Sequence, residues 1–210
     1  CVDLVEISPR LRAVQAQTLS QTLAQPLAQT GITPAWHGSL AEVPEDAPIL
    51  CLANEMFDAL PVRQIERTAQ GWCERLVTLA PQDGAKSGEA SAALAFALAP
   101  PSPKAAAYVP PALRDAPVGA IVEVCPTGLS LAAELGRRVG DQGGAALIVD
   151  YGRAVPAAEP TLQAVRQHAR ADVLADPGTA DLTAHVDFPM LARALGESGA
   201  EVHGPVGQGD

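Results

Sequence analysis

The chain has 210 residues, 48% of them hydrophobic, and a formal net charge of −10. The apolar content suffices for a packed core and excludes a disordered chain, while the acidic balance argues against binding to a nucleic-acid backbone. Its four cysteines form no Cys-x-x-Cys pair, so we expect neither disulfides nor a metal site. No apolar run approaches the roughly 20 residues of a membrane-spanning helix.

The N-terminal part of the chain alternates between strand and helix patterns. An apolar run predicts a strand over 2–7, and a Ser-Pro pair with helical spacing of leucines predicts a helix over 9–29. Two further strands are predicted over 32–37 and 48–53. This alternation is typical of a doubly wound parallel sheet.

The middle of the chain has a different character. Residues 61–80 carry apolar positions on both sides of the Gln70–Gly71 pair, which predicts a β-hairpin. Residues 81–117 are rich in Ala, Pro, Gly and Ser, and we interpret them as an insertion that is helical over 89–98 and otherwise loop.

The last third returns to the α/β pattern. We predict a strand over 121–124, a helix over 127–139 and a buried strand over 145–150. A helix over 188–198 and a strand over 201–203 follow.

Glu6 follows the first predicted strand. In the crevice of a nucleotide-binding α/β sheet, a carboxylate at this place can accept hydrogen bonds from both ribose hydroxyls. A solvated glutamate, or one that interacts with the next helix, fits the same pattern. Glu6 is therefore a candidate cofactor ligand, but its position alone does not distinguish between these roles.

Asn54, Glu55 and Asp58 follow the strand predicted over 48–53. A carboxylate fixed at a strand tip can orient a guanidinium through paired hydrogen bonds or accept a proton from a nucleophilic nitrogen. The alternative is that Asn54 caps a helix and the two acids lie near its positive end. These residues are the candidate catalytic group.

A third group combines Tyr151, at the tip of the strand over 145–150, with His185 and Asp187 in the segment 181–187. His185 can transfer a proton or form a pocket wall, although a loop histidine often has only a structural role. The chain has no Gly-x-Ser-x-Gly elbow and no Gly-Lys-Ser/Thr phosphate loop, which argues against a hydrolase or a phosphate-loop nucleotidase.

Several segments, in this order along the chain, form a longer pattern that covers nearly all of it except 81–117. They are 5–12, 53–62, 71–77, 145–152, 161–166, 176–178, 181–188 and 204–209. Together they resemble the MidA-like family of class I S-adenosylmethionine-dependent methyltransferases. This family is related to the mitochondrial complex I assembly factor that methylates an arginine of a core subunit.

The resemblance implies an α/β fold, with a Rossmann-like class I methyltransferase sheet and an insertion after its fourth strand. Residues 1–60 and 118–210 would form the methyltransferase core, and 61–117 the insertion, a hairpin followed by the Ala/Pro-rich segment. The family's glycine-rich loop and last strand have no counterpart within 1–210. We therefore expect a sheet that is incomplete at both ends and a cofactor pocket that residues 1–210 form only in part.

The resemblance also implies roles for the candidate residues. S-adenosylmethionine would be the cofactor, with Glu6 on its ribose and Asn54 at the junction of cofactor and substrate. Glu55 would orient the acceptor guanidinium, with Asp58 nearby. Tyr151, His185 and Asp187 are expected to bind the substrate.

The implied partner is a protein substrate, an arginine-containing subunit of respiratory complex I, with no nucleic acid and no membrane span. The location implied is the cytoplasm of a bacterium, or the mitochondrial matrix if the source is eukaryotic. The alternative is a non-catalytic complex I assembly chaperone that retains the methyltransferase fold. A dinucleotide-dependent oxidoreductase would share the sheet pattern, but the motifs of the family disfavour it.

Overall fold

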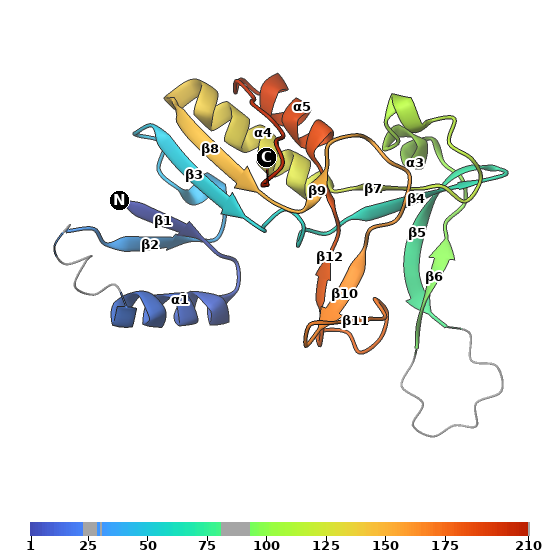
Figure 1. Ribbon diagram of the computed structural model, residues 1–210, viewed down its shortest axis with the longest axis horizontal. Coiled ribbons are helices and arrows are strands. Elements are labelled where there is room, and N and C mark those ends of the chain that lie inside the picture. Colours follow the sequence, from blue (N-terminus) through green and yellow to red (C-terminus); the bar gives the residue numbers. More distant parts are fainter. Residues whose placement is uncertain (23–28, 30, 81–92, 210) are drawn as a thin grey trace.

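The computed structural model describes residues 1–22, 29, 31–80 and 93–209, and Figure 1 shows how the elements are arranged. Its helices are α1 (Pro9–Thr22), α3 (Pro103–Ala107), α4 (Pro126–Gln142) and α5 (Phe188–Glu197), with 3₁₀ turns over Leu40–Glu42 and Pro111–Leu113. Within these ranges no helix is both long and apolar enough to cross a membrane. The helix predicted over 9–29 is confirmed as α1, while 23–28 lie outside the described residues.

The predicted parallel pairing is found in two places. β1 (Val2–Val5) pairs with β2 (Pro34–His37), and β3 (Ile49–Asn54) pairs with β8 (Gly144–Val149), both in parallel. Figure 1 shows α1 on one side of the first pair and α4 with α5 on the opposite side of the second. The α/β architecture is therefore confirmed.

These four strands do not form the single sheet that the alternating pattern predicts. In the described part of the chain they form two separate two-stranded sheets, because no described strand lies between β1 and β3 to receive hydrogen bonds from both. A strand can join a sheet only through a neighbour about 4.8 Å away.

Four further strands form an antiparallel sheet in the order β6-β5-β4-β7. The predicted hairpin is confirmed as β4 (Arg63–Thr68) and β5 (Gly71–Leu79), and β7 (Ile121–Val124) lies against β4. This sheet packs on α3 around Ile65 and other buried side chains, listed as Trp72, Ala105, Val109, Ala120, Val122 and Val124. The sheet thus takes strands from both sides of residue 117, and the division into core and insertion stays a prediction.

The helical prediction over 89–98 is wrong for its last five residues. Leu94–Leu98 form β6, whose Phe96 lies opposite Val77 of β5, while 89–92 lie outside the described residues. Alanines favour a helix only weakly, by fractions of a kcal/mol each. The open edge of β5 supplies hydrogen-bond partners and cross-strand contacts that outweigh this preference.

The strand predicted over 201–203 is also absent from the described structure. All three residues are exposed and make no strand pairing there. An extended apolar pattern does not form a strand unless another backbone receives its hydrogen bonds.

α4 and α5 pack closely because glycine lies at their contact. A Cβ built on Gly136 would lie 3.0 Å from the Cα of Leu195 and closer still to its carbonyl oxygen. The adjoining core contains Ala53, Phe57 and Ala132. The predicted helices over 127–139 and 188–198 are confirmed as these two elements.

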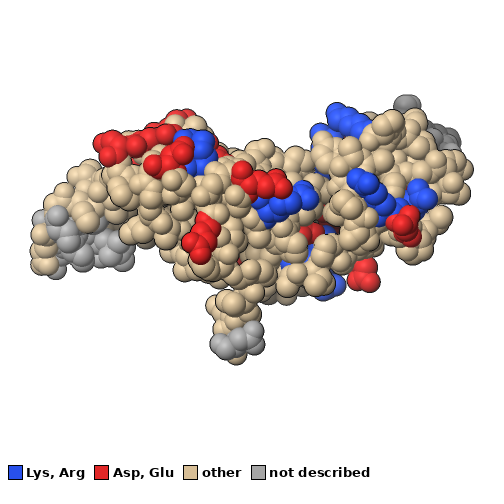
Figure 2. Space-filling model, turned by 90° about the horizontal axis from the view of Figure 1, so that it is seen from above, with Lys and Arg blue, Asp and Glu red and all other residues tan. Residues whose placement is uncertain are grey.

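A buried arginine ties α4 to the loop before β3. The side chain of Arg138 is fully buried and donates to Glu134 Oε1 at 3.2 Å and to the carbonyl oxygen of Val43 at 2.8 Å. Its neighbour Arg137 pairs with Glu45 at 2.7 Å. Figure 2 shows a mainly acidic cluster with an adjacent basic group at one end of the visible face.

The remaining strands are short. β9 (Gly152–Arg153) pairs in parallel with β13 (Val186–Asp187), and β10 (Gln163–Arg166) pairs with both β11 (Ala169–Ala171) and β12 (Asp181–Thr183). The pairing of β13 with β9 places residues 186–187 beside the residues that follow β8.

Candidate functional site

The carboxyl ends of β3 and β8 meet at one edge. Asn54 lies opposite Val149 in the parallel register, and the backbone N–H of Glu55 donates to the carbonyl oxygen of Val149 at 2.8 Å. Asn54 and Glu55 are both exposed. The sequence-based placement of these two residues at a strand tip is confirmed.

Asp150 shapes the turn that follows β3. Its Oδ2 accepts the backbone N–H groups of Met56 at 3.1 Å, Phe57 at 2.8 Å and Asp58 at 3.3 Å. A carboxylate that accepts several backbone N–H groups holds a turn firmly because hydrogen bonds to a charged acceptor are strong. Glu55, at the start of this turn, has φ +47°, a conformation that non-glycine residues rarely adopt.

Three carboxylates therefore lie close together at this edge: Glu55, Asp58 and Asp150. The pKa of Asp58 is raised above its ordinary value, first by desolvation and then by the negative charges of Asp150 and Glu55. Such an edge disfavours further negative charge and favours a cationic ligand, since each carboxylate raises the cost of ionising its neighbours.

The segment 181–187 is fastened to both strand tips. The N–H of Ala184 donates to the carbonyl oxygen of Asp58 and that of Val186 to the carbonyl oxygen of Tyr151, each at 2.9 Å. Gly152 allows this approach, because a Cβ there would contact the carbonyl oxygen of Val186. The fold thus brings Asn54, Glu55, Asp58, Tyr151, His185 and Asp187 to one edge.

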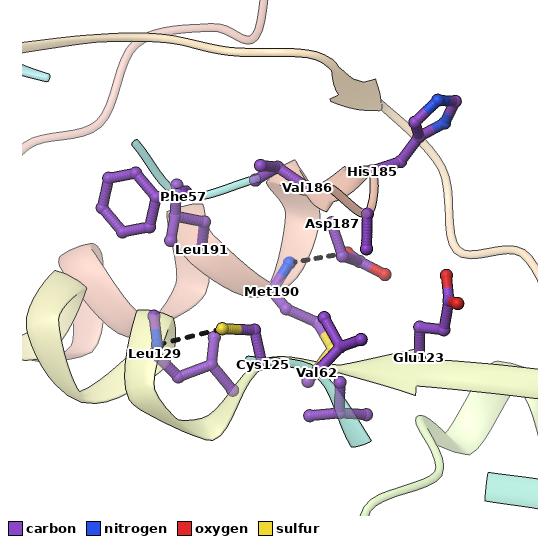
Figure 3. A pocket seen from close by; sticks show the side chains of 13 residues that line it. Phe57, Val62, Glu123, Cys125, Leu129, His185, Val186, Asp187, Met190 and Leu191 are labelled. Carbon is purple, nitrogen blue, oxygen red and sulfur yellow. Dashed lines mark hydrogen bonds between the residues drawn. The ribbon is translucent and has the colours of Figure 1, made fainter. Parts of the chain in front are cut away.

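The side chains of the third candidate group differ in their surroundings. Tyr151 and His185 are exposed, and the ring of His185 points away from the neighbouring pocket (Figure 3). Asp187 is nearly buried: its Oδ1 accepts the N–H of Met190 at 3.0 Å as the N-cap of α5, and its Oδ2 lies 3.6 Å from Arg153 Nε. Asp187 is therefore engaged in holding α5 and β9.

Glu6 lies at the carboxyl end of β1, in the other parallel pair. Its Oε1 accepts the N–H of Ser8 at 2.8 Å, and its Oε2 lies 3.4 Å from Gln15 Nε2. Its other partners are the side chain of Arg12 and the carbonyl oxygen of His37. Among the described residues, the hydrogen-bond partners of Glu6 all lie within residues 8–37, and its predicted role on the cofactor ribose stays a prediction.

A small pocket lies beside the edge, between Phe57, β7 and the first turns of α4 and α5 (Figure 3). Its cavity volume of about 30 Å³ has room for a water molecule or two, since one water needs roughly 10–15 Å³ of such space. Its walls are mainly apolar, with Leu129, Met190 and Leu191 among them. A nucleoside cofactor does not fit here, and the exposed edge at Asn54 and Glu55 remains the candidate site.

The sequence shows Asp150 as the polar end of the strand predicted over 145–150, but its role in the turn after β3 was not predicted. Sequence reasoning missed two further residues, Glu123 and Thr161. Glu123 is a charged residue inside the otherwise apolar run 121–124, which is a signal for a paired buried group. Thr161 carries no such signal, because its contacts arise only from the fold.

Comparisons with known proteins all find methyltransferases among the similar proteins. A family model described as "Putative S-adenosyl-L-methionine-dependent methyltransferase" matches residues 1–206. The mitochondrial protein arginine methyltransferase NDUFAF7 is 35% identical in Xenopus tropicalis and 38% in Mus musculus, each over 219 aligned residues and 99% of this chain. The chain spans 48% and 47% of these two relatives, about half of their length.

A solved structure is similar as well. A superfamily member from Burkholderia thailandensis, with bound S-adenosyl-homocysteine, has a TM-score of 0.72 at 28% sequence identity. The similarity covers 94% of this chain and 48% of that one.

Proposed function

Because this chain belongs to the S-adenosyl-L-methionine-dependent methyltransferase family, we propose that the whole protein transfers a methyl group to an arginine side chain of a protein substrate. The observation that carries the proposal is the match over residues 1–206 together with the exposed carboxylate edge at the tips of β3 and β8. The relatives named as protein arginine methyltransferases support the choice of acceptor.

Glu6 is suited to the ribose of the cofactor. Among the described residues, its Oε2 makes only the 3.4 Å hydrogen bond with Gln15, which leaves acceptor capacity for ribose hydroxyls. Asn54, exposed at the tip of β3, offers both a donor and an acceptor to the same ligand. When bound, S-adenosylmethionine supplies an electrophilic methyl group.

Glu55 is assigned the acceptor guanidinium. A carboxylate binds a guanidinium through two parallel hydrogen bonds, which fixes both the position and the plane of the group. Asp58 and Asp150 add negative charge at the same edge, and this favours a cation there. Since alignment of the reacting groups supplies much of the rate in such reactions, orientation by Glu55 is the main catalytic contribution of this edge.

Tyr151 and His185, exposed beside the edge, are assigned to the surface that receives the substrate protein, and Asp187 supports them by holding β9 and α5. We infer that the substrate is a subunit of respiratory complex I. We also infer a location in the mitochondrial matrix if the source is eukaryotic, as for the relatives named mitochondrial, and in the cytoplasm if it is bacterial.

The test compares the intact protein with Glu55→Gln. Methylation of an arginine-containing complex I subunit is followed by mass spectrometry, and S-adenosylmethionine binding by calorimetry. We expect kcat to fall by roughly 10²-fold or more, the usual effect of removing a group that acts on the transition state, with cofactor affinity nearly unchanged. Unchanged turnover would remove Glu55 from this role.

The alternative, a non-catalytic assembly chaperone, gives a different result. It is favoured if the intact wild-type protein binds both the cofactor and the subunit but forms no methylated product under any condition that supports binding.

A further inference from the structure

A buried carboxylate lies behind the candidate site. Glu123 of β7 is only 3% exposed, and four groups donate to it. Its Oε1 accepts Gln64 Nε2 at 2.8 Å and the N–H of Leu162 at 3.0 Å, and its Oε2 accepts the N–H and the hydroxyl of Thr161 at 2.8 and 2.6 Å. Burying a charge is costly unless every oxygen is satisfied, as it is here.

The hydrogen bonds of Glu123 continue, through Thr161, into the segment 181–187 beside the tips of β3 and β8. The hydroxyl of Thr161 donates to Glu123 and accepts the backbone N–H of His185 at 2.8 Å. His185 lies between Ala184 and Val186, whose N–H groups are bound by Asp58 and Tyr151. The backbone N–H groups of three consecutive residues, 184–186, are thus hydrogen-bonded. The middle one, that of His185, binds Thr161, which in turn binds Glu123.

On its other side the network crosses the four-stranded sheet. Gln64 of β4 lies opposite Glu123 of β7 in the antiparallel register, and Arg75 Nη1 of β5 donates to Gln64 Oε1 at 3.4 Å. The guanidinium of Arg75 also lies 4.0 Å from the ring centre of Phe96. Arg75 thus donates to the same amide that donates to Glu123, and the hydrogen bonds join side chains of β5, β4 and β7.

We propose that Glu123, acting through Thr161, is a positioning residue that holds the His185 segment against the tips of β3 and β8 so that it can receive the substrate protein. The proposal rests on the proposed function. Cooperative buried networks of this kind specify one arrangement of the groups they join. Glu123 touches none of the reacting groups, so its loss acts on substrate binding more than on the chemical step.

The first test uses Thr161→Val in the intact protein, which removes the bridging hydroxyl but keeps the shape of the side chain. Loss of one hydrogen bond at the segment predicts a KM for the substrate protein raised roughly five- to tenfold. We expect kcat and S-adenosyl-homocysteine affinity to change less than threefold. Thr161→Ser keeps the hydroxyl and should restore the wild-type KM.

Thr183→Val is the matched control. Its hydroxyl lies in the adjoining β12 and accepts Gln163 Nε2 at 3.3 Å, so the substitution removes a hydroxyl nearby without breaking the bridge to Glu123. We expect its KM to stay close to that of the wild type. Equal increases in both valine variants, or a wild-type KM in Thr161→Val, would overturn the proposal.

Amide hydrogen exchange gives a readout that does not depend on methylation. Thr161→Val should speed exchange of the His185 N–H and leave that of the Val186 N–H unchanged, and Glu123→Gln should act in the same direction. If the wild-type protein forms no methylated product, the proposed function fails, whereas the exchange series and direct binding of the substrate protein still decide the role of Thr161. Unaltered exchange at His185 would refute the bridge.

Discussion

The contact between α4 and α5 allows one prediction to be worked out from the structure. In Gly136→Ala the new methyl carbon would lie 3.0 Å from the Cα of Leu195, 3.1 Å from its carbonyl carbon and closer to its oxygen. Carbon atoms prefer separations of about 3.5–4.0 Å. The obstacle is backbone of α5, which cannot rotate away as a flexible side chain can, so the two helices must separate.

Two opposing terms set the magnitude. Alanine is a better helix residue than glycine by about 1 kcal/mol. Overpacking a tight contact typically costs about 1–3 kcal/mol, and this contact is at the severe end because backbone is involved. We therefore expect Gly136→Ala to lower the free energy of unfolding by about 1–2 kcal/mol.

Gly196→Ala supplies the control within the same helix pair. A Cβ there would meet only Val202 Cγ2 at 3.9 Å, an ordinary contact, so the gain in helix preference is left unopposed. The variant should be more stable by about 0.5 kcal/mol, since Gly196 lies near the end of α5. Urea denaturation of the intact protein, followed by circular dichroism, measures both. Shifts of the same sign in the two variants would refute the packing argument.

Two further predictions concern the acidic edge. Asp150→Asn replaces a charged acceptor by an amide whose N–H₂ group faces backbone donors. We therefore expect the free energy of unfolding, measured by denaturation, to fall by about 2 kcal/mol, and the methylation rate to fall as well. A variant as stable as the wild type would show that the turn at 56–58 does not need this charge. Asp58 has a raised pKa in the folded state, so the native form binds more protons and stability falls as pH rises from 3.8 through that raised value. Asp58→Asn removes this pH-dependent loss of stability. The free energy of unfolding of the variant relative to the wild type should therefore rise with pH between 3.8 and the raised pKa and stay constant above it. A stability difference that does not depend on pH would contradict the raised pKa of Asp58.

The local elements and the placement of the candidate residues at strand tips were predictable where one short-range rule dominates. The apolar runs of β3 and β8 and the acids that follow them are adjacent in the chain, and parallel strands place their carboxyl ends at the same edge. The placement of Asn54 and Glu55 followed from this rule, and the family followed from motifs spread along the chain.

The tertiary structure decided what depends on partners far apart in the chain. Residues 94–98 became a strand because β5 presents an open edge to them, and 201–203 did not because the described structure gives them no such edge. The bridge from Glu123 to Thr161 and His185 joins positions 38 and 24 residues apart. A sequence shows which side chains can donate or accept hydrogen bonds. Whether a buried carboxylate receives enough of them depends on which distant donors the packed chain brings within about 3 Å.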